Sequence, residues 1–180
     1  MQNSDINRRF SDWLLNPRET LDFEVKSWLD LSDEEHRAMV AKALIAMENH
    51  GGGHLLIGYK ADPENRLVPD VMRPSSLKHF DEDTVNDILK RYAEPRFQVD
   101  VSLQMHPETG EEHPLYTVHG NSTVPVRTAS ASPSGKVPQH AYFIRRTGPE
   151  SNRPQNGAEW DALIRRCVQR QRRARQNFCV

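Results

Sequence analysis

The run of three glycines, Gly51–Gly53, constrains the fold most, because the hydrophobic period changes across it. Before the run, apolar side chains keep the i, i+3, i+4, i+7 spacing of an amphipathic helix; they are Val40, Ala43, Leu44 and Met47. After the run, residues 54–60 alternate as in a strand. Glycine adopts the left-handed backbone that ends many helices. We therefore expect a helix that opens with a capping box, Ser32 with Glu35, and reaches the glycines, then a tight turn, then a strand.

Helices and strands are mixed along the rest of the chain, which indicates an α+β fold. The other expected elements, in chain order, are a helix over 4–15, a strand over 21–28, a helix over 81–93, a strand over 97–105 with its hairpin partner over 115–119, a strand over 140–147 and a helix capped by Asn156. The stretch 121–139 is rich in Ser, Pro and Thr and is predicted to be an exposed loop. A length of 180 residues suits one domain.

The strand predicted over 21–28 carries the strongest candidate site. Its polar positions place Asp22, Glu24 and Lys26 on one face. Glu19 is an odd number of residues before Glu24, so it can join Glu24 only from a turn or helix end before the strand, where Pro17 favours a break. Two carboxylates and a lysine suit a divalent cation acting on a phosphodiester. From these residues alone, the alternative is an ordinary strand with a solvated charged face.

Charge is unevenly distributed along the chain. The formal net charge is -1, but His140–Val180 holds nine arginines and only three acidic residues. This basic segment suggests contact with a polyanion, although a solvated basic helix face explains the charge equally well. The two cysteines, Cys167 and Cys179, have no zinc-ligand spacing and indicate no disulfide framework, and no apolar run is long enough to cross a bilayer. We therefore expect a cytoplasmic protein.

Three other patterns are weaker candidates for a site. The glycine run is no P-loop, because a helix precedes it and a strand follows, which reverses the order that a P-loop requires. Three histidines lie on the predicted hairpin, where exposed strand positions explain them better than zinc ligation does; they are His106, His113 and His119. Asp62 follows the strand after the glycines and, taken alone, is a turn aspartate.

Taken together, the motifs resemble the Schlafen-type AlbA-like domain family. Its members show an E/D-x-K strand, a helix ending in an A-N-x-x-G-G-like stretch and a strand of G-x-L-x-I-G-V type. The matching segments here are Glu24–Lys26, Glu48–Gly53 and His54–Tyr59, with Tyr142–Arg145 similar to the closing strand of the family. The resemblance covers residues 18–166 and implies one such domain with a mixed, mostly antiparallel sheet. It leaves 1–17 as an N-terminal helix and 167–180 as a basic helix end or tail. The helix end departs from the family in Glu48–His50, where small residues are common, and Tyr59 replaces a common valine.

The resemblance also implies a function. In nuclease-active Schlafens, two glutamates and one aspartate form a metal-binding triad, which Glu19, Glu24 and Asp62 match here, with Lys26 beside Glu24. The chain is then a metal-dependent endoribonuclease that uses Mg²⁺ or Mn²⁺ and cleaves structured RNA, with tRNA as the first candidate. The expected phosphate contacts are Lys60, Arg145, Arg146 and Arg153. Many family members lack the triad, so the alternative is a non-catalytic nucleic-acid-binding module of a regulatory or defence system. A nucleotide-binding protein that uses the glycine turn is a third reading.

The same resemblance suggests an assembly. Animal Schlafens place two AlbA-like lobes around a basic groove, whereas this chain has the length of one lobe. Two copies related by a two-fold axis would rebuild the groove, so we expect a homodimer, with a monomer that binds RNA on a flat face as the alternative.

Overall fold

The computed structural model describes residue 10 and residues 13–177, and its centre is a four-stranded sheet. The strand order is β1-β2-β7-β6, with bounds Phe23–Lys26, Gly53–Ile57, Glu112–Val118 and Val99–Met105. β1 pairs with β2 in parallel, and the other two pairings are antiparallel. The predicted α+β class and mixed, mostly antiparallel sheet are therefore confirmed.

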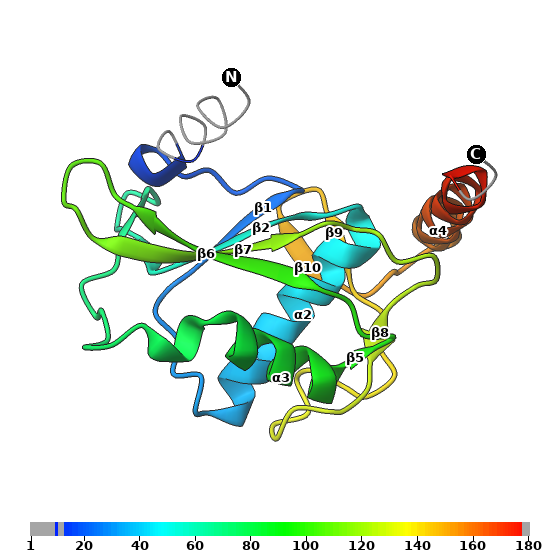
Figure 1. Cartoon of the computed structure of the whole chain (residues 1–180), viewed down its shortest axis with the longest axis horizontal. Helices are drawn as coiled ribbons and strands as arrows, with labels where there is room; N and C mark the ends of the chain where they lie inside the picture. Colours follow the sequence, from blue (N-terminus) through cyan, green and yellow to red (C-terminus); the bar gives the residue numbers. More distant parts are fainter. Residues whose placement is uncertain (1–9, 11–12, 178–180) are drawn as a thin grey trace.

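Two helices, α2 (Glu34–His50) and α3 (Glu82–Tyr92), cover one face of this sheet (Figure 1). Side chains alternate between the two faces, so Leu55 and Ile57 pack in the main core with α2 and α3, whereas Leu56 packs on the opposite face. There it meets Phe23 and Val25 of β1 and the N-terminal part of the chain. Both faces of β1 are thus covered, and the side of Glu24 is the side of α2.

Smaller elements frame the sheet. They are β3 (Tyr59–Ala61) paired with β4 (Leu67–Pro69), β5 (Ala93–Glu94) paired with β8 (Arg127–Thr128), β9 (Ile144–Arg146) paired with β10 (Glu150–Asn152), the 3₁₀ helix η1 (Lys78–Phe80) and the C-terminal helix α4 (Gly157–Asn177). The strand predicted over 54–60 is divided at Gly58, whose φ of 98° favours glycine. The strand predicted over 140–147 is shortened to β9.

The start of α2 differs from the predicted capping box. Asp33 is the N-cap, and its Oδ1 accepts the N–H of Glu35 at 2.7 Å. Ser32 does not cap the helix because its hydroxyl donates to Asp30 Oδ1 at 2.6 Å. The carboxylate of Glu35 instead accepts hydrogen bonds from the segment 121–139, including one from the N–H of Ser134 at 3.0 Å.

The segment predicted as an exposed loop is partly buried against the end of α2. Asn49 holds it there: its Nδ2 donates to the carbonyls of Val126 at 2.7 Å and Phe143 at 2.9 Å, and its Oδ1 accepts the N–H of Val126 at 2.8 Å. Asn49 and Val126 are both fully buried. Asn49, from the helix-end stretch Glu48–Gly53, therefore fixes the segment that leads into β9. Beyond it, Gly52 has a φ of 107°, and a Cβ there would lie 2.7 Å from the carbonyl oxygen of Val118.

The predicted domain bounds at the two ends of the chain can be compared with the helices that the structure describes there. The helix predicted over 4–15 lies largely outside the described residues, which include residues 10 and 13–15 of it in helical conformation. The division predicted after residue 166 falls inside α4, where Leu163 and Cys167 both pack against Ile144 of β9. Within the described part of the chain, none of the helices combines the length and the apolar character that crossing a bilayer requires.

Candidate functional site

Glu19 and Glu24 line one cavity of about 420 Å³ at the end of β1. Glu19 precedes the strand, as its odd spacing from Glu24 requires, and its Oε1 accepts the N–H of Val25 at 3.0 Å. Lys26 from β1, Lys42 from α2 and residues of β10 complete the wall. β1 with the segment before it on one side, and α2 on the other, thus bring the two carboxylates to a common space.

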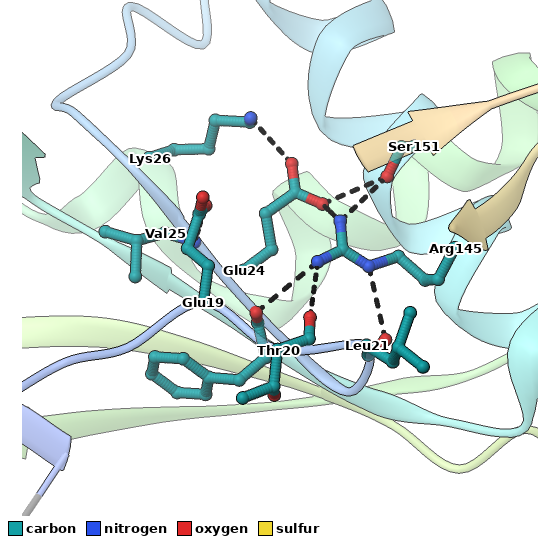
Figure 2. Close-up of polar contacts among 9 residues, drawn as sticks. Glu19, Thr20, Leu21, Glu24, Val25, Lys26, Arg145 and Ser151 are labelled. Atoms are coloured by element: carbon teal, nitrogen blue, oxygen red, sulfur yellow. Dashed lines mark hydrogen bonds and ion pairs between the residues drawn. The ribbon is translucent and has the colours of Figure 1, made fainter. Parts of the chain in front are cut away.

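Glu24 is buried rather than solvated, with 4% of its surface exposed. Its Oε1 forms an ion pair with Lys26 Nζ at 2.6 Å. Its Oε2 pairs with the guanidinium of Arg145 and accepts the hydroxyl of Ser151 at 3.0 Å, as Figure 2 shows. The alternative of a solvated charged face therefore does not hold for Glu24, whereas Asp22 on the same face is exposed.

Arg145 is the structural partner of this carboxylate. Its side chain has no exposed surface, and it also donates to the carbonyls of Thr20 at 2.7 Å and Leu21 at 3.2 Å (Figure 2). These contacts tie β9 to the turn that carries Glu19. The prediction that Arg145 contacts phosphate does not fit this structure, because a side chain enclosed in this way cannot reach a bound polyanion.

Lys42 brings a second ammonium group to the cavity. It lies in the middle of α2 and is half-buried, with its Nζ 5.3 Å from the centre of the Phe143 ring. Burial lowers the pKa of Lys42, while the nearby carboxylate of Glu24 acts in the opposite direction. The cavity therefore combines carboxylates with two lysines, which is a set of groups suited to a phosphate and its counter-charge.

Asp62 lies elsewhere, in the turn between β3 and β4. Its Oδ1 accepts the N–H groups of Glu64 at 2.9 Å and Arg66 at 2.8 Å, and its Oδ2 pairs with the guanidinium of Arg66 at 2.8 Å. The N–H and the guanidinium of Arg66 lower the pKa of Asp62. Asp62 does not line the cavity of Glu19 and Glu24. Within residues 10 and 13–177, no three His, Cys, Asp or Glu side chains are grouped so that they could hold a metal ion. The structure thus does not bring the predicted triad together.

The other predicted phosphate contacts differ in their exposure and in whether an acidic residue pairs with them. Lys60 pairs with Asp70 at 2.9 Å but is 44% exposed, and Arg146 pairs with Glu159 at 2.8 Å. Arg153 is exposed and lines a second cavity beside the first. Arg153 is thus the member of the predicted set that is best placed to meet a bound strand.

Three glutamates line the cavity, and two of them, Glu19 and Glu24, form a donor set that Mg²⁺ accepts, because this ion is commonly held by one or two carboxylates together with waters and phosphate oxygens. Glu19 is anchored through Oε1. Glu24 is oriented by Arg145 and Ser151 on one oxygen, while its other oxygen is shared with Lys26. By their chemistry, Glu19 and Glu24 would suit a divalent cation, and Asp62 is not placed to act as a third ligand.

Comparison with known proteins places this arrangement in a family. The family model described as Schlafen, AlbA_2 matches residues 19–154, which include the whole wall of the cavity. The chain belongs to the Schlafen AlbA_2 family. Membership indicates a function related to nucleic acids.

Two solved structures are similar to this Schlafen AlbA_2 chain. The DIP2311 protein of Corynebacterium diphtheriae matches 90% of it with a TM-score of 0.55 and 14% identity, and the match spans 29% of the length of that protein. The N-terminal domain of a RecG-related protein from Nitrosomonas europaea matches 84% of it and 88% of that domain, with a TM-score of 0.40 and 22% identity. The first likeness supports the fold. No curated protein matches the chain.

Sequence reasoning missed two residues of this Schlafen AlbA_2 site. Lys42 stands between two alanines in the buried stretch of α2, and a lysine in that position was a signal that it lines a cavity. Ser151 had no comparable signal, because its role depends on the pairing of β10 with β9 beside Glu24.

Proposed function

We propose that this chain is a metal-dependent endoribonuclease that cleaves structured RNA, with tRNA as the first candidate. The observation that supports the proposal is the meeting of Glu19, Glu24, Lys26 and Lys42 in one cavity. Carboxylates that hold a cation and ammonium groups that neutralise phosphate are the recurring parts of phosphodiester chemistry.

Each residue has a distinct role in this proposal. Glu19 and Glu24 would hold Mg²⁺ or Mn²⁺, which when bound polarises a water molecule and neutralises charge on the phosphate. Arg145 is a positioning residue, since it fixes the carboxylate of Glu24 from the buried side. Lys26 is 30% exposed and can leave Glu24 for a phosphate oxygen. Asp62 stays outside this site because Arg66 already occupies its carboxylate.

A non-catalytic nucleic-acid-binding module is the second candidate. The observation that favours it is the pairing of both Glu24 oxygens with cationic side chains, which neutralises the carboxylate without a metal ion. In this case, the lysines of the cavity would bind phosphate and no bond would break.

Digestion of purified tRNA and of total RNA separates the two candidates. We expect cleavage with Mg²⁺ or Mn²⁺ and none with EDTA. Glu19→Gln should lower the rate about 100-fold, equivalent to about 2.7 kcal/mol of transition-state stabilisation. Gln keeps an acceptor oxygen for the N–H of Val25, so the turn is preserved. The matched control is Asp62→Asn, which makes the same charge change outside the cavity and should leave the rate within about threefold. RNA binding without cleavage in any metal ion would favour the non-catalytic module.

We also propose that two copies assemble around a two-fold axis. Arg172, Arg173 and Arg175 are exposed on α4 and would line the shared groove, whereas Arg166 and Arg170 donate to carbonyls at the end of α2. Two-fold dimers are the commonest symmetric assembly. Light scattering should give twice the chain mass of 20.7 kDa. The mass of one chain, unchanged by added RNA, would contradict this assembly.

A further inference from the structure

A second cavity of about 650 Å³ adjoins the proposed catalytic cavity. Lys42 and Asn152 line both cavities, so these two side chains form a shared wall. The second cavity extends from this wall over the chain before β9 to the first turn of α4. A polymer bound in the first cavity would therefore continue into the second.

The two cavities differ in charge. Three glutamates and two lysines line the first, and they are Glu19, Glu24, Glu150, Lys26 and Lys42. Lys42, Lys136 and Arg153 bring three cations to the second, and its lining residues include no Asp or Glu. Lys136 and Arg153 are exposed, so both can reach a ligand. The second cavity is thus a site for a group that carries negative charge.

The second cavity also holds an aromatic pair. Trp160 and Tyr142 meet edge to face, with ring centres 5.3 Å apart and planes at 75°. Trp160 is nevertheless 36% exposed, which is uncommon for so large an apolar ring and leaves surface for a flat partner. Its backbone is fixed in the first turn of α4, where its N–H donates to the carbonyl of Asn156 at 3.3 Å. The ring is therefore a supported platform rather than a loose surface group.

We propose that this second cavity binds the nucleotide next to the scissile phosphate, with its base stacked on Trp160, whose ring Tyr142 supports edge to face, and its phosphates at Lys136 and Arg153. Lys42 lies in the shared wall and would contact the phosphate that links this nucleotide to the neighbouring nucleotide in the first cavity. The inference rests on the proposed function for the choice of scissile phosphate. A base must be unpaired to stack on a protein ring, so the substrate class is RNA with a single-stranded segment at the cleavage point. Stacking on aromatic rings tolerates every base, and recognition here should depend little on base identity.

Equilibrium binding tests this site without cleavage. The probe is a fluorescently labelled, single-stranded RNA of six nucleotides, and its anisotropy is followed in EDTA. Trp160→Ala should weaken binding about tenfold, in line with the loss of one stacked base. Trp160→Phe keeps a ring and should weaken binding only about twofold. Thermal melting of each variant confirms that the fold is retained.

The basic residues have a separate readout. Lys136→Ala combined with Arg153→Ala should lower the slope of log affinity against log salt by about 1.4, because each phosphate contact on a single strand contributes about 0.7. The matched control is Lys78→Ala combined with Lys90→Ala, which removes two exposed lysines outside both cavities and should leave the slope unchanged.

Two results would overturn the site. One is unchanged affinity in a folded Trp160→Ala variant, and the other is equally tight binding of the probe and of a duplex of the same length. These results are independent of the nuclease assay, because binding is measured in EDTA. If the chain never cleaves RNA but Trp160→Ala weakens binding of the probe, the nuclease proposal is refuted and the nucleotide site is supported. If the chain cleaves RNA and the Trp160→Ala variant binds the probe as tightly as the unaltered chain, the nucleotide site is refuted and the nuclease proposal stands.

Discussion

Replacing Arg145 with alanine should destabilise the fold far more than replacing its neighbour Arg146. The Arg145 side chain is wholly enclosed and the side chain of its partner Glu24 is 5% exposed, so the variant leaves a buried carboxylate without its guanidinium. Breaking a buried ion pair from one side costs about 3–5 kcal/mol. Lys26 still pairs with Glu24 at 2.6 Å and limits this loss. The carbonyls of Thr20 and Leu21 lose a donor, which adds about 1 kcal/mol each.

We therefore expect Arg145→Ala to lower the free energy of unfolding by about 4 kcal/mol. For a chain of this length, the melting temperature should fall by about 10 °C. Urea denaturation followed by circular dichroism measures the free energy, and a thermal scan measures the temperature. The control, Arg146→Ala, removes a partly exposed pair with Glu159 and should cost less than about 1 kcal/mol.

A double-mutant cycle sharpens this test. If the ion pair is decisive, the double variant Glu24→Leu with Arg145→Met should lose less free energy of unfolding than the two single variants lose in sum. The difference should be at least about 1 kcal/mol, because neither charge is left alone. Equal stability of Arg145→Ala and Arg146→Ala would refute the reasoning.

Three further changes have expected outcomes. The pKa of Asp62 is lowered by Arg66, so its contribution to stability is present above the ordinary value of 3.8 and is lost as the pH falls below it; Asp62→Asn should flatten the fall in melting temperature on the acid side. The pKa of Lys42 is lowered by burial, so the unfolded chain binds more protons in the pH range between this lowered pKa and 10.5, and stability rises with pH in that range; Lys42→Gln should remove that rise in urea titrations at successive pH values. Asn49→Ala leaves three buried backbone groups without partners, which should cost about 3 kcal/mol and speed amide hydrogen exchange at Val126.

The sequence was sufficient for those parts of the fold that depend on local signals. The helix that became α2 and the helix that became α3 follow from the spacing of their apolar residues, and the turn between α2 and β2 follows from its glycines. The position of Glu19 before the strand followed from counting residues to Glu24 and from Pro17. In each case, the deciding interaction joins residues that are close along the chain.

The remaining parts depend on partners that are distant along the chain. Nothing near Arg145 shows that its guanidinium faces a carboxylate 121 residues earlier, so its charge alone suggested an exposed phosphate contact. Asn49 likewise bonds to Val126, 77 residues away. Asp62 is the opposite case: the spacing matched a family triad, while the competing partner, Arg66, was only four residues away in a recognisable turn.

The pairing of Glu24 with Arg145 also determines when the cavity can form during translation. β1 leaves the ribosome before β9, and the buried counter-ion of Glu24 follows it 121 residues later. At typical translation rates of about 5–20 residues per second, the gap is roughly 6 to 24 s. During that interval, the carboxylate of Glu24 can pair with Lys26 but lacks its buried partner Arg145. The cavity therefore forms only after β9 has been synthesised, and a nascent chain that stops before β9 would contain Glu19 and Glu24 without Arg145, which orients the carboxylate of Glu24.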